Sequence, residues 1–289
     1  MIKQTHFIPL LLVATICSCV LSTAIPKDST RDILVDFFNS TNGSAWKFKQ
    51  GWLSSSPVCT WSGVACDPNN NVVSLALYQN SLSGTIPSSL GKLSSLQSLQ
   101  LWNNDLAGTI PSTLGQLTQL KELHLGWNAL SGTIPASFVQ LQQLELFYAF
   151  TNTLTGDISV VEQMTGLKKV ALGSNLLAGT ISPMIQKLSE LIQLDLGANN
   201  LSGTIPAEIG ELSNVSSLDF SLNQLTGTIP AALGKLANLA DLQLDSNEFT
   251  SISPSYGRQK SLVMCGMRFN KFRCPIPKWT QFNCYAQCN

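Results

Sequence analysis

The sequence has little charge and no excess of either sign. Charged residues make up only 12% of the 289 residues, and 17 lysines and arginines balance 17 aspartates and glutamates. Proteins that bind nucleic acids or anionic membranes concentrate positive charge, because both partners are polyanions. A chain with zero formal net charge has no such excess, so we predict no nucleic-acid partner and no electrostatic membrane binding.

Histidine is scarce, and the common catalytic motifs are absent from the sequence. Of two histidines, only His124 lies beyond the N-terminal segment. The motifs G-x-S-x-G and H-E-x-x-H, the P-loop and the dinucleotide fingerprint do not occur, so nothing indicates an assembled nucleophile, base and orienting group. We therefore predict no enzymatic activity, no cofactor and no metal site, and we expect His124 to be a solvent-exposed contact residue.

A long hydrophobic run occurs only at the N-terminus. Lys3 precedes an apolar stretch from Ile8 to Ile16, and small residues precede a cleavage site after Ala24, which is the anatomy of a secretory signal peptide. An uncleaved membrane anchor is the alternative, but the run is short for a membrane span. No second apolar span follows, so we predict no stable membrane insertion and a secreted protein, with association at the cell surface or cell wall left open.

The cysteines and sequons fit an extracellular protein. Removing residues 1–24 leaves six cysteines, an even number that predicts disulfides in an oxidising compartment. The pairing of the last four is not determined by the sequence. The predicted disulfide cysteines are Cys59, Cys66, Cys265, Cys274, Cys284 and Cys288, and the candidate glycosylation sites are Asn39, Asn42, Asn200 and Asn214.

The richest feature of the sequence is a repeat. The phrase LSGTIP stands at residues 82–87, 130–135 and 201–206, and four near copies stand in register with it. Each unit reads approximately L-x-x-L-x-L-x-x-N-x-L-x-G-x-I-P-x-x-L, with 23 or 24 residues between starts. The units start at Val72, Leu96, Leu120, Leu144, Leu167, Leu191, Val215, Leu239 and Leu262, and their asparagines are Asn80, Asn104, Asn128, Asn152, Asn175, Asn199, Asn223, Asn247 and Asn270.

The spacing within each unit predicts its local structure. Alternating leucines such as Leu99 and Leu101 indicate a short strand with its apolar side inward. One coil cannot bury these leucines, but stacked coils form a continuous core and a parallel sheet. The asparagine amide both donates and accepts, so it suits a turn whose backbone groups face the interior. The glycine frees the backbone, and the proline ends the extended stretch before a helical return.

Over residues 72–277 this pattern closely resembles the plant-type extracellular leucine-rich repeat family, which includes receptor ectodomains and polygalacturonase inhibitors. The resemblance implies an α/β solenoid, a right-handed superhelix of about nine coils with a parallel concave sheet, a second strand in each coil and a cap at each end. The expected divisions are a signal peptide (1–24), an N-terminal cap (25–71), repeats 1–8 (72–261), and a last degenerate repeat with a cysteine-rich cap (262–289).

The N-terminal cap carries its own expectations from the resemblance. Trp46, Trp52 and Trp61 are expected to cover the first coil, and Cys59 is expected to pair with Cys66. Polygalacturonase inhibitors usually carry a second cysteine pair in this cap, and this chain does not, so the match to them is incomplete.

The outward strand positions provide the candidate binding residues. If the inward residues lie three and five positions after each start, then those at two, four, six and seven face the concave surface. The first four coils place aromatic residues there, and the later coils place aspartates. The predicted ligand-binding residues are Tyr78, Trp102, Glu122, His124, Trp127, Tyr148, Phe150, Asp195, Asp219, Asp241 and Asp245. The alternative is that the aromatic residues only raise strand propensity and pack on one another.

Two local features have more than one interpretation. Asp195 and Asp219 occupy equivalent positions in adjacent coils, where their carboxylates would repel by about 1 kcal/mol in water. A basic partner, hydroxyl donors, a cation or simple solvation would relieve this. The unit at Leu144 carries Ala149, Asp157 and Ser159 at atypical positions and lacks one residue. It represents either tolerated drift or a local change of curvature.

Three functional hypotheses follow. The first is a secreted recognition protein that binds a protein, peptide or glycan on the concave face, in defence or signalling, for example as a polygalacturonase-inhibitor-like protein or a soluble receptor partner. The second is an ice-binding protein that uses a regular threonine column. The third is a cell-surface or matrix structural protein, which would self-associate. Oligomeric state is not predicted. The threonine column comprises Thr85, Thr109, Thr133, Thr180, Thr204 and Thr228.

Overall fold

The computed structural model describes residues 29–253, 261–273 and 285–286. The predicted signal peptide and the cysteines Cys274, Cys284 and Cys288 lie outside these residues. Cys265 lies within them and is disulfide-bonded. None of the helices in the described ranges combines the length and the apolar character needed to cross a bilayer.

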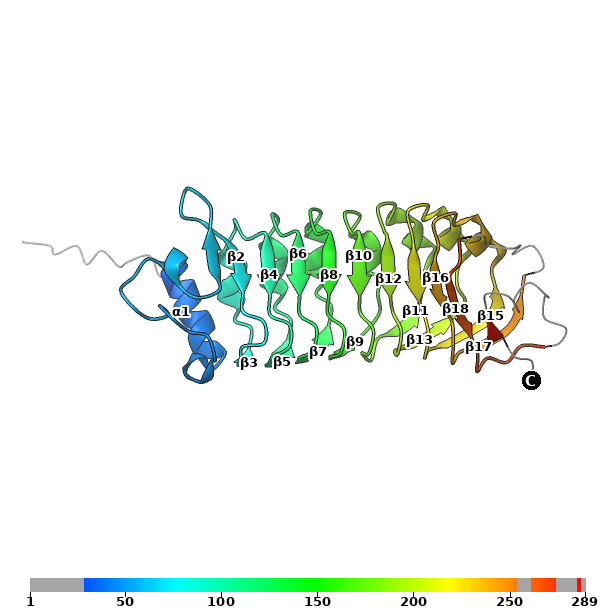
Figure 1. Cartoon of the computed structure of the whole chain (residues 1–289), viewed down its shortest axis with the longest axis horizontal. Coiled ribbons are helices and arrows are strands. Elements are labelled where there is room, and N and C mark those ends of the chain that lie inside the picture. Colours follow the sequence, from blue (N-terminus) through cyan, green and yellow to red (C-terminus); the bar gives the residue numbers. More distant parts are fainter. Residues whose placement is uncertain (1–28, 254–260, 274–284, 287–289) are drawn as a thin grey trace, which may run out of the picture.

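The molecule is an elongated stack of coils with one long sheet along its side (Figure 1). This eleven-stranded sheet is parallel except for its first pair, β1 and β2. We call its solvent side, which corresponds to the predicted concave surface, the front face. Its strands are β1 (Val64–Cys66), β2 (Val72–Ala76), β4 (Ser98–Gln100), β6 (Glu122–His124), β8 (Leu146–Tyr148), β10 (Lys169–Ala171), β12 (Gln193–Asp195), β14 (Ser217–Asp219), β16 (Asp241–Gln243), β18 (Met264–Met267) and β19 (Tyr285–Ala286).

The core follows the predicted alternation. In β4 the central Leu99 is fully buried, while its neighbours Ser98 and Gln100 are half-buried on the front face. Leu99 pairs in register with Leu75 on one side and Leu123 on the other. Leucines in equivalent positions therefore stack along the molecule, and a single apolar core extends through the coils.

The asparagines form the predicted hydrogen-bond ladder. In Asn128, Nδ2 donates to the carbonyls of Leu101 at 3.0 Å and Leu125 at 3.1 Å, and Oδ1 accepts from the Leu106 N–H at 3.0 Å. One amide thus satisfies backbone groups in neighbouring coils that no water reaches. Asn80 bonds instead to both backbone groups of Phe48 in the N-terminal segment. The prediction that each side chain donates and accepts is confirmed.

The GTI segments form the implied second strands, but these make two sheets rather than one. The long front sheet has no break at the point where the two smaller sheets separate, because β8 pairs with β10 there. The first sheet contains β3 (Ser83–Thr85), β5 (Asp105–Thr109), β7 (Ala129–Thr133) and β9 (Thr153–Thr155), and the second contains β11 (Ala178–Thr180), β13 (Asn200–Gly203), β15 (Gln224–Ile229) and β17 (Glu248–Ile252).

The interruption follows the atypical unit at Leu144. There Asp157 stands in place of the usual threonine, and its carboxylate accepts from the backbone N–H of Ser159 at 3.0 Å. The back turn of this coil carries Glu162, which is only 2% exposed and accepts from the backbone N–H of Ser182 in the next coil at 2.8 Å. Asp157 and Glu162 therefore make hydrogen bonds at the place where the first smaller sheet ends and the second begins.

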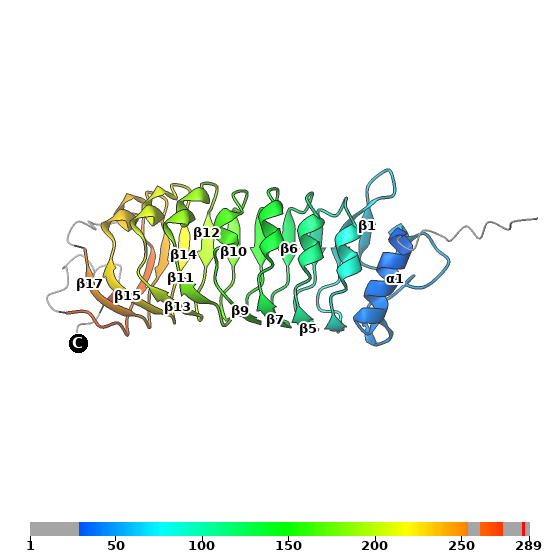
Figure 2. The ribbon, with the colours of Figure 1, turned by 180° about the vertical axis from the view of Figure 1, so that it is seen from behind.

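The backs of the first seven coils carry the predicted helical return, which takes the form of short 3-10 turns (Figure 2). Leucines and isoleucines such as Leu114 and Ile185 point from these turns into the core. The turns are η3 (Ser88–Lys92), η4 (Ser112–Gln116), η5 (Ala136–Gln140), η6 (Val161–Gln163), η7 (Pro183–Lys187), η8 (Ala207–Glu211) and η9 (Ala231–Lys235).

The N-terminal end of the stack is covered by α1 (Thr30–Ser40), with η1 (Gly43–Ala45) and η2 (Val58–Thr60) after it (Figure 1). A capping box between Ser29 and Asp32 starts the helix, because the side chains satisfy backbone N–H groups that have no helical partner. The three tryptophans predicted to cover the first coil are buried, with exposed fractions of 3% for Trp46, 7% for Trp52 and 1% for Trp61.

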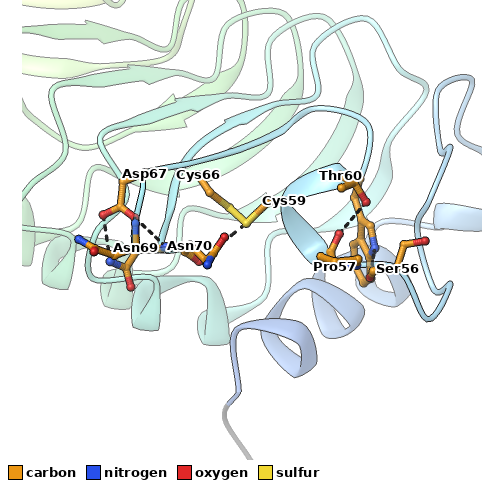
Figure 3. Close-up of a disulfide and its surroundings, with 10 residues drawn as sticks. Ser56, Pro57, Cys59, Thr60, Cys66, Asp67, Asn69 and Asn70 are labelled. Carbon is orange, nitrogen blue, oxygen red and sulfur yellow. Dashed lines mark hydrogen bonds between the residues drawn. A yellow bond between two sulfur atoms is a disulfide. The ribbon is translucent and has the colours of Figure 1, made fainter.

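A disulfide between Cys59 and Cys66 closes a loop beside this aromatic cluster, as expected from the resemblance (Figure 3). The adjoining turn is held by Asp67, whose carboxylate accepts from the backbone N–H groups of Asn69 and Asn71, each at 2.9 Å. The hydrogen bond from the Asn71 side-chain amide, at 2.9 Å, together with these backbone bonds lowers the pKa of Asp67.

Candidate functional site

Four aromatic side chains form a continuous row across the front face at the ends of neighbouring strands. We call Tyr78, Trp102, Trp127 and Phe150 the aromatic row. The rings of Tyr78 and Trp102 stack at 4.7 Å between centroids with only 6° between their planes. Trp102 lies 6.3 Å from Trp127, and Trp127 meets Phe150 edge-on at 4.9 Å. The structure therefore brings together aromatic residues that the sequence places in four separate coils.

Tyr148 and His124 lie beside the row on adjacent strands. Their Cα atoms are in register, and their ring centroids are 4.7 Å apart. His124 is less accessible than expected: its Nε2 is buried and has no hydrogen-bond partner within the described residues. Burial lowers the pKa of His124, and the nearby Glu122 carboxylate opposes that shift. His124 lies at an outward strand position as predicted, but it is half-buried instead of solvent-exposed, because the Tyr148 ring lies against it.

These rings surround an apolar pocket of about 270 Å³, lined by Trp102, His124, Gly126, Trp127, Tyr148 and Phe150. Gly126 makes the close packing possible. A Cβ at this position would lie 2.9 Å from Cε1 of Phe150, which is closer than packed carbon atoms approach. The pocket therefore depends on a glycine in one coil facing a phenylalanine in the next.

Trp127 is held in an unfavourable backbone conformation. Its φ is +52°, in the left-handed region that costs residues with a Cβ about 1–2 kcal/mol. Its side chain is also 49% exposed. Leu222 occupies the equivalent position in a later coil, with φ +55° and 57% exposure. Neither position has a backbone requirement for a large apolar side chain, so Trp127 is better explained by what its ring contacts.

The N-terminal segment extends this surface beyond the predicted residues. Phe48 is 56% exposed and lines, with Lys47 and Tyr78, a hollow of about 480 Å³. Sequence reasoning missed Phe48 and Lys47 because they belong to no repeat. No periodic signal marks these residues, because exposed Lys47 and Phe48 directly follow buried Trp46 without alternation.

The later coils present acidic groups on the same face. Asp195 and Asp219 pair in register on β12 and β14. Asp195 accepts from the Gly197 N–H at 3.0 Å, and Asp219 accepts from the Ser221 N–H at 2.8 Å. Burial raises the pKa of Asp195, its bond to Gly197 opposes this, and the Asp219 carboxylate adds to the rise. Donors two residues along each strand thus partly satisfy the two predicted neighbouring carboxylates.

The remaining predicted acids do not join this pair. Asp241 accepts from Gln243 Nε2 at 2.7 Å, and Asp245 accepts from the backbone N–H of Arg268. Glu122 lies nearer the aromatic row, where it accepts from Ser98 Oγ at 3.0 Å. No group of three or more histidine, cysteine or acidic side chains in the described ranges is arranged to hold a metal ion.

Five residues of the threonine column lie in strands of the two smaller sheets, Thr204 directly follows β13, and all six are exposed. Its methyl groups have a packing role. At Gly132 and Gly203, a Cβ would lie 2.9 Å from Cγ2 of Thr109 and Thr180 in the preceding coils, and both glycines have positive φ. The column is also offset, because Thr109 pairs with Ser131 instead of Thr133.

The four candidate glycosylation sites are all exposed, and none belongs to the front strands. Asn200 begins β13 and shares a strand face with Ser202, two residues later. Asn42 donates from Nδ2 to Ser83 Oγ at 3.2 Å, at the edge of the first small sheet. The front face is thus separate from these four asparagines.

Two family models, both described as leucine rich repeat, match the chain. One matches residues 94–154, and the other matches residues 71–93, 190–212 and 214–236. A receptor-like serine/threonine-protein kinase with leucine-rich repeats from Arabidopsis thaliana is 35% identical over 83 residues, which are 28% of this chain and 10% of that protein. The chain therefore aligns with only a small part of this relative.

Solved structures show the same architecture over most of the chain. The structure of PEPR1 with AtPEP1 matches with a TM-score of 0.78 and 32% identity, over 86% of this chain and 36% of that chain. A plant ice-binding protein matches with a TM-score of 0.65 and 25% identity, over 86% of this chain and 88% of that chain. With its repeats, ladder and stacked parallel strands, the chain carries leucine-rich repeats in a solenoid that is similar to plant receptor ectodomains.

Proposed function

We propose that this is a secreted, non-enzymatic recognition protein that binds an extracellular peptide, or an extended segment of a protein, on its front face. The aromatic row is the central part of the site. The observation that carries the proposal is a set of partly exposed rings around a pocket, at positions where the repeat itself requires no aromatic residue. Clustered Trp and Tyr side chains are common anchors of protein recognition.

The exposure of the Trp127 ring supports a role in binding. This position has a positive φ in the other coils as well, with residues as different as Gln79 and Ala198, so the backbone does not require a tryptophan whose ring is half exposed. The likeness to PEPR1, whose structure was determined with AtPEP1, supports a peptide as the ligand class.

The proposal is tested by capture from the surrounding medium. Purified wild-type protein and the double variant Trp102→Ala/Trp127→Ala are incubated with concentrated extracellular fluid, and bound peptides are identified by mass spectrometry. We expect specific peptides on the wild type and their loss from the double variant. Leu222→Ala is the matched control, because Leu222 has the equivalent backbone position and a similar exposure outside the aromatic row. Equal capture by all three proteins would refute the assignment of the site.

Ice binding is the second candidate. It is favoured by the exposed threonine column and by the ice-binding neighbour, which this chain matches over most of both lengths. The packing of threonine methyl groups on glycines gives the column a second explanation. An ice-recrystallisation assay on the purified protein separates the candidates, since a peptide receptor leaves crystal growth unchanged. A glycan at Asn200 would cover part of this surface, so the assay is repeated with Asn200→Gln.

A further inference from the structure

We infer that the ligand is an extended peptide with two recognition elements: an apolar ring side chain that enters the aromatic pocket, and a lysine or arginine about three residues away that lies over Asp195 and Asp219. This inference rests on the proposed peptide-binding function and specifies its ligand. It follows from the size and chemistry of the pocket and from the register of the front strands.

The pocket suits one apolar side chain. Its volume of about 270 Å³ is below the ~300–1,000 Å³ of typical sites for whole small molecules. Its walls are four aromatic rings, a glycine and His124, whose Nε2 is already buried. A sugar would bury hydroxyl groups there without partners, at a cost of about 1–3 kcal/mol for each. A proline or aromatic side chain has no such groups to satisfy.

The strand register connects this pocket to the carboxylates. Tyr148 pairs with Ala171, Ala171 pairs with Asp195, and Asp195 pairs with Asp219. Ala171 is small and only 8% exposed, so no long side chain stands between the ring and the first carboxylate along this row. Two strand spacings of ~4.8 Å separate them, and an extended peptide advances ~3.3 Å per residue. The basic residue therefore lies about three positions from the apolar one.

The carboxylates specify the charge of the second element. Asp195 and Asp219 stand side by side, and neither forms an ion pair within the described residues. Within the described ranges, Lys168 pairs with Glu145, Lys235 with Glu211 and Lys271 with Glu248. A cation between the two carboxylates relieves their mutual repulsion and is attracted to each of them. A neutral or acidic ligand residue would gain neither effect.

The probe is a displayed library of random peptides of about 12 residues, long enough at ~3.3 Å per residue to span the face. Selection on the full-length protein is expected to enrich an apolar ring residue with lysine or arginine about three positions away. The Asp195→Asn/Asp219→Asn variant is expected to lose the enrichment of the basic residue and keep that of the apolar residue. Asp105→Asn, a control on β5 away from the front face, should select as the wild type does.

A charge swap tests the pairing directly. The affinity of one selected peptide should fall at least about tenfold on Asp195→Lys/Asp219→Lys, because both carboxylates are replaced by charges that repel the basic residue, and should recover when the peptide's basic residue is changed to glutamate. Apolar enrichment without a basic residue, or without dependence on the two aspartates, overturns this inference and leaves the proposed function in place. Enrichment that persists on Trp102→Ala/Trp127→Ala, or no enrichment at all, overturns both.

Discussion

The coils of β4 to β8 and those of β12 to β14 share one backbone but present different surfaces. Both bury apolar residues at the same positions of the repeat and share the same asparagine ladder, shown by Asn128 in the first region and Asn199 in the second. Their front faces differ completely: the first carries stacked rings around a pocket, and the second carries paired carboxylates. What the two regions share specifies the fold, and what differs between them specifies recognition.

The largest expected effect is on stability, through the asparagine ladder that the two regions share. Asn128→Ala and Asn199→Ala each leave several buried backbone groups without partners, at about 1–3 kcal/mol for each unsatisfied group. We expect the free energy of unfolding to fall by several kcal/mol in both variants. The two losses should be similar, because the ladder is the same in both regions. Urea denaturation followed by circular dichroism measures this. A large loss in one region and none in the other would show that the two backbones are not equivalent.

The second prediction separates the two surfaces. Trp127→Asn should reduce affinity for a captured or selected peptide by roughly 30-fold, the ~2 kcal/mol of a binding hot spot. Its stability should change by less than ~1 kcal/mol, because asparagine tolerates the positive φ and offsets the lost ring packing. Leu222→Asn makes the same backbone change in the acidic region and should leave affinity unchanged. Equal effects on binding at both positions would contradict the assignment of recognition to the aromatic row.

The third prediction is that the two regions respond to acid with opposite sign. The pKa of Asp195 is raised from 3.8 by burial, so folding is penalised above its folded pKa, and that penalty disappears as pH falls toward 3.8. The pKa of His124 is lowered from 6.5 by burial, so protonation of His124 costs stability as pH falls from 6.5 through its folded pKa. Relative to wild type, Asp195→Asn should be most stabilising near neutral pH and His124→Phe most stabilising at low pH, in thermal denaturation across pH.

The smallest expected effect concerns the threonine column on the two smaller sheets. Thr133→Val keeps the methyl group that lies where Gly156 has no Cβ, so stability should change by less than ~0.5 kcal/mol, and Thr133→Ala should cost slightly more. Neither variant should alter peptide binding. Loss of peptide binding in Thr133→Val would move the site from the front face to the smaller sheets.

The fold was predictable from the sequence because its rules are local and repeated. The buried Leu99 and the ladder residue Asn128 follow from spacing alone, since each coil places the same residue in the same environment. The gathering of aromatic residues was predictable for the same reason, once the outward strand positions were known.

The finer features of the site depend on neighbours that the periodicity does not specify. The burial of His124 depends on how the Tyr148 ring tilts, and the pocket depends on Gly126 meeting Phe150 in the next coil. Phe48 lies outside the repeat, so no spacing rule placed it. At the break between the smaller sheets, Asp157 and Glu162 make local hydrogen bonds, and the sequence indicated only an irregular unit there.

The central claim is that recognition resides in the aromatic row, and it is tested most directly by calorimetric titration of one selected peptide into three proteins. The wild type and Leu222→Ala are expected to bind it with equal affinity, and Trp102→Ala/Trp127→Ala is expected to show no measurable heat of binding while keeping the wild-type circular dichroism spectrum. Equal affinity of all three proteins for the peptide would contradict the account.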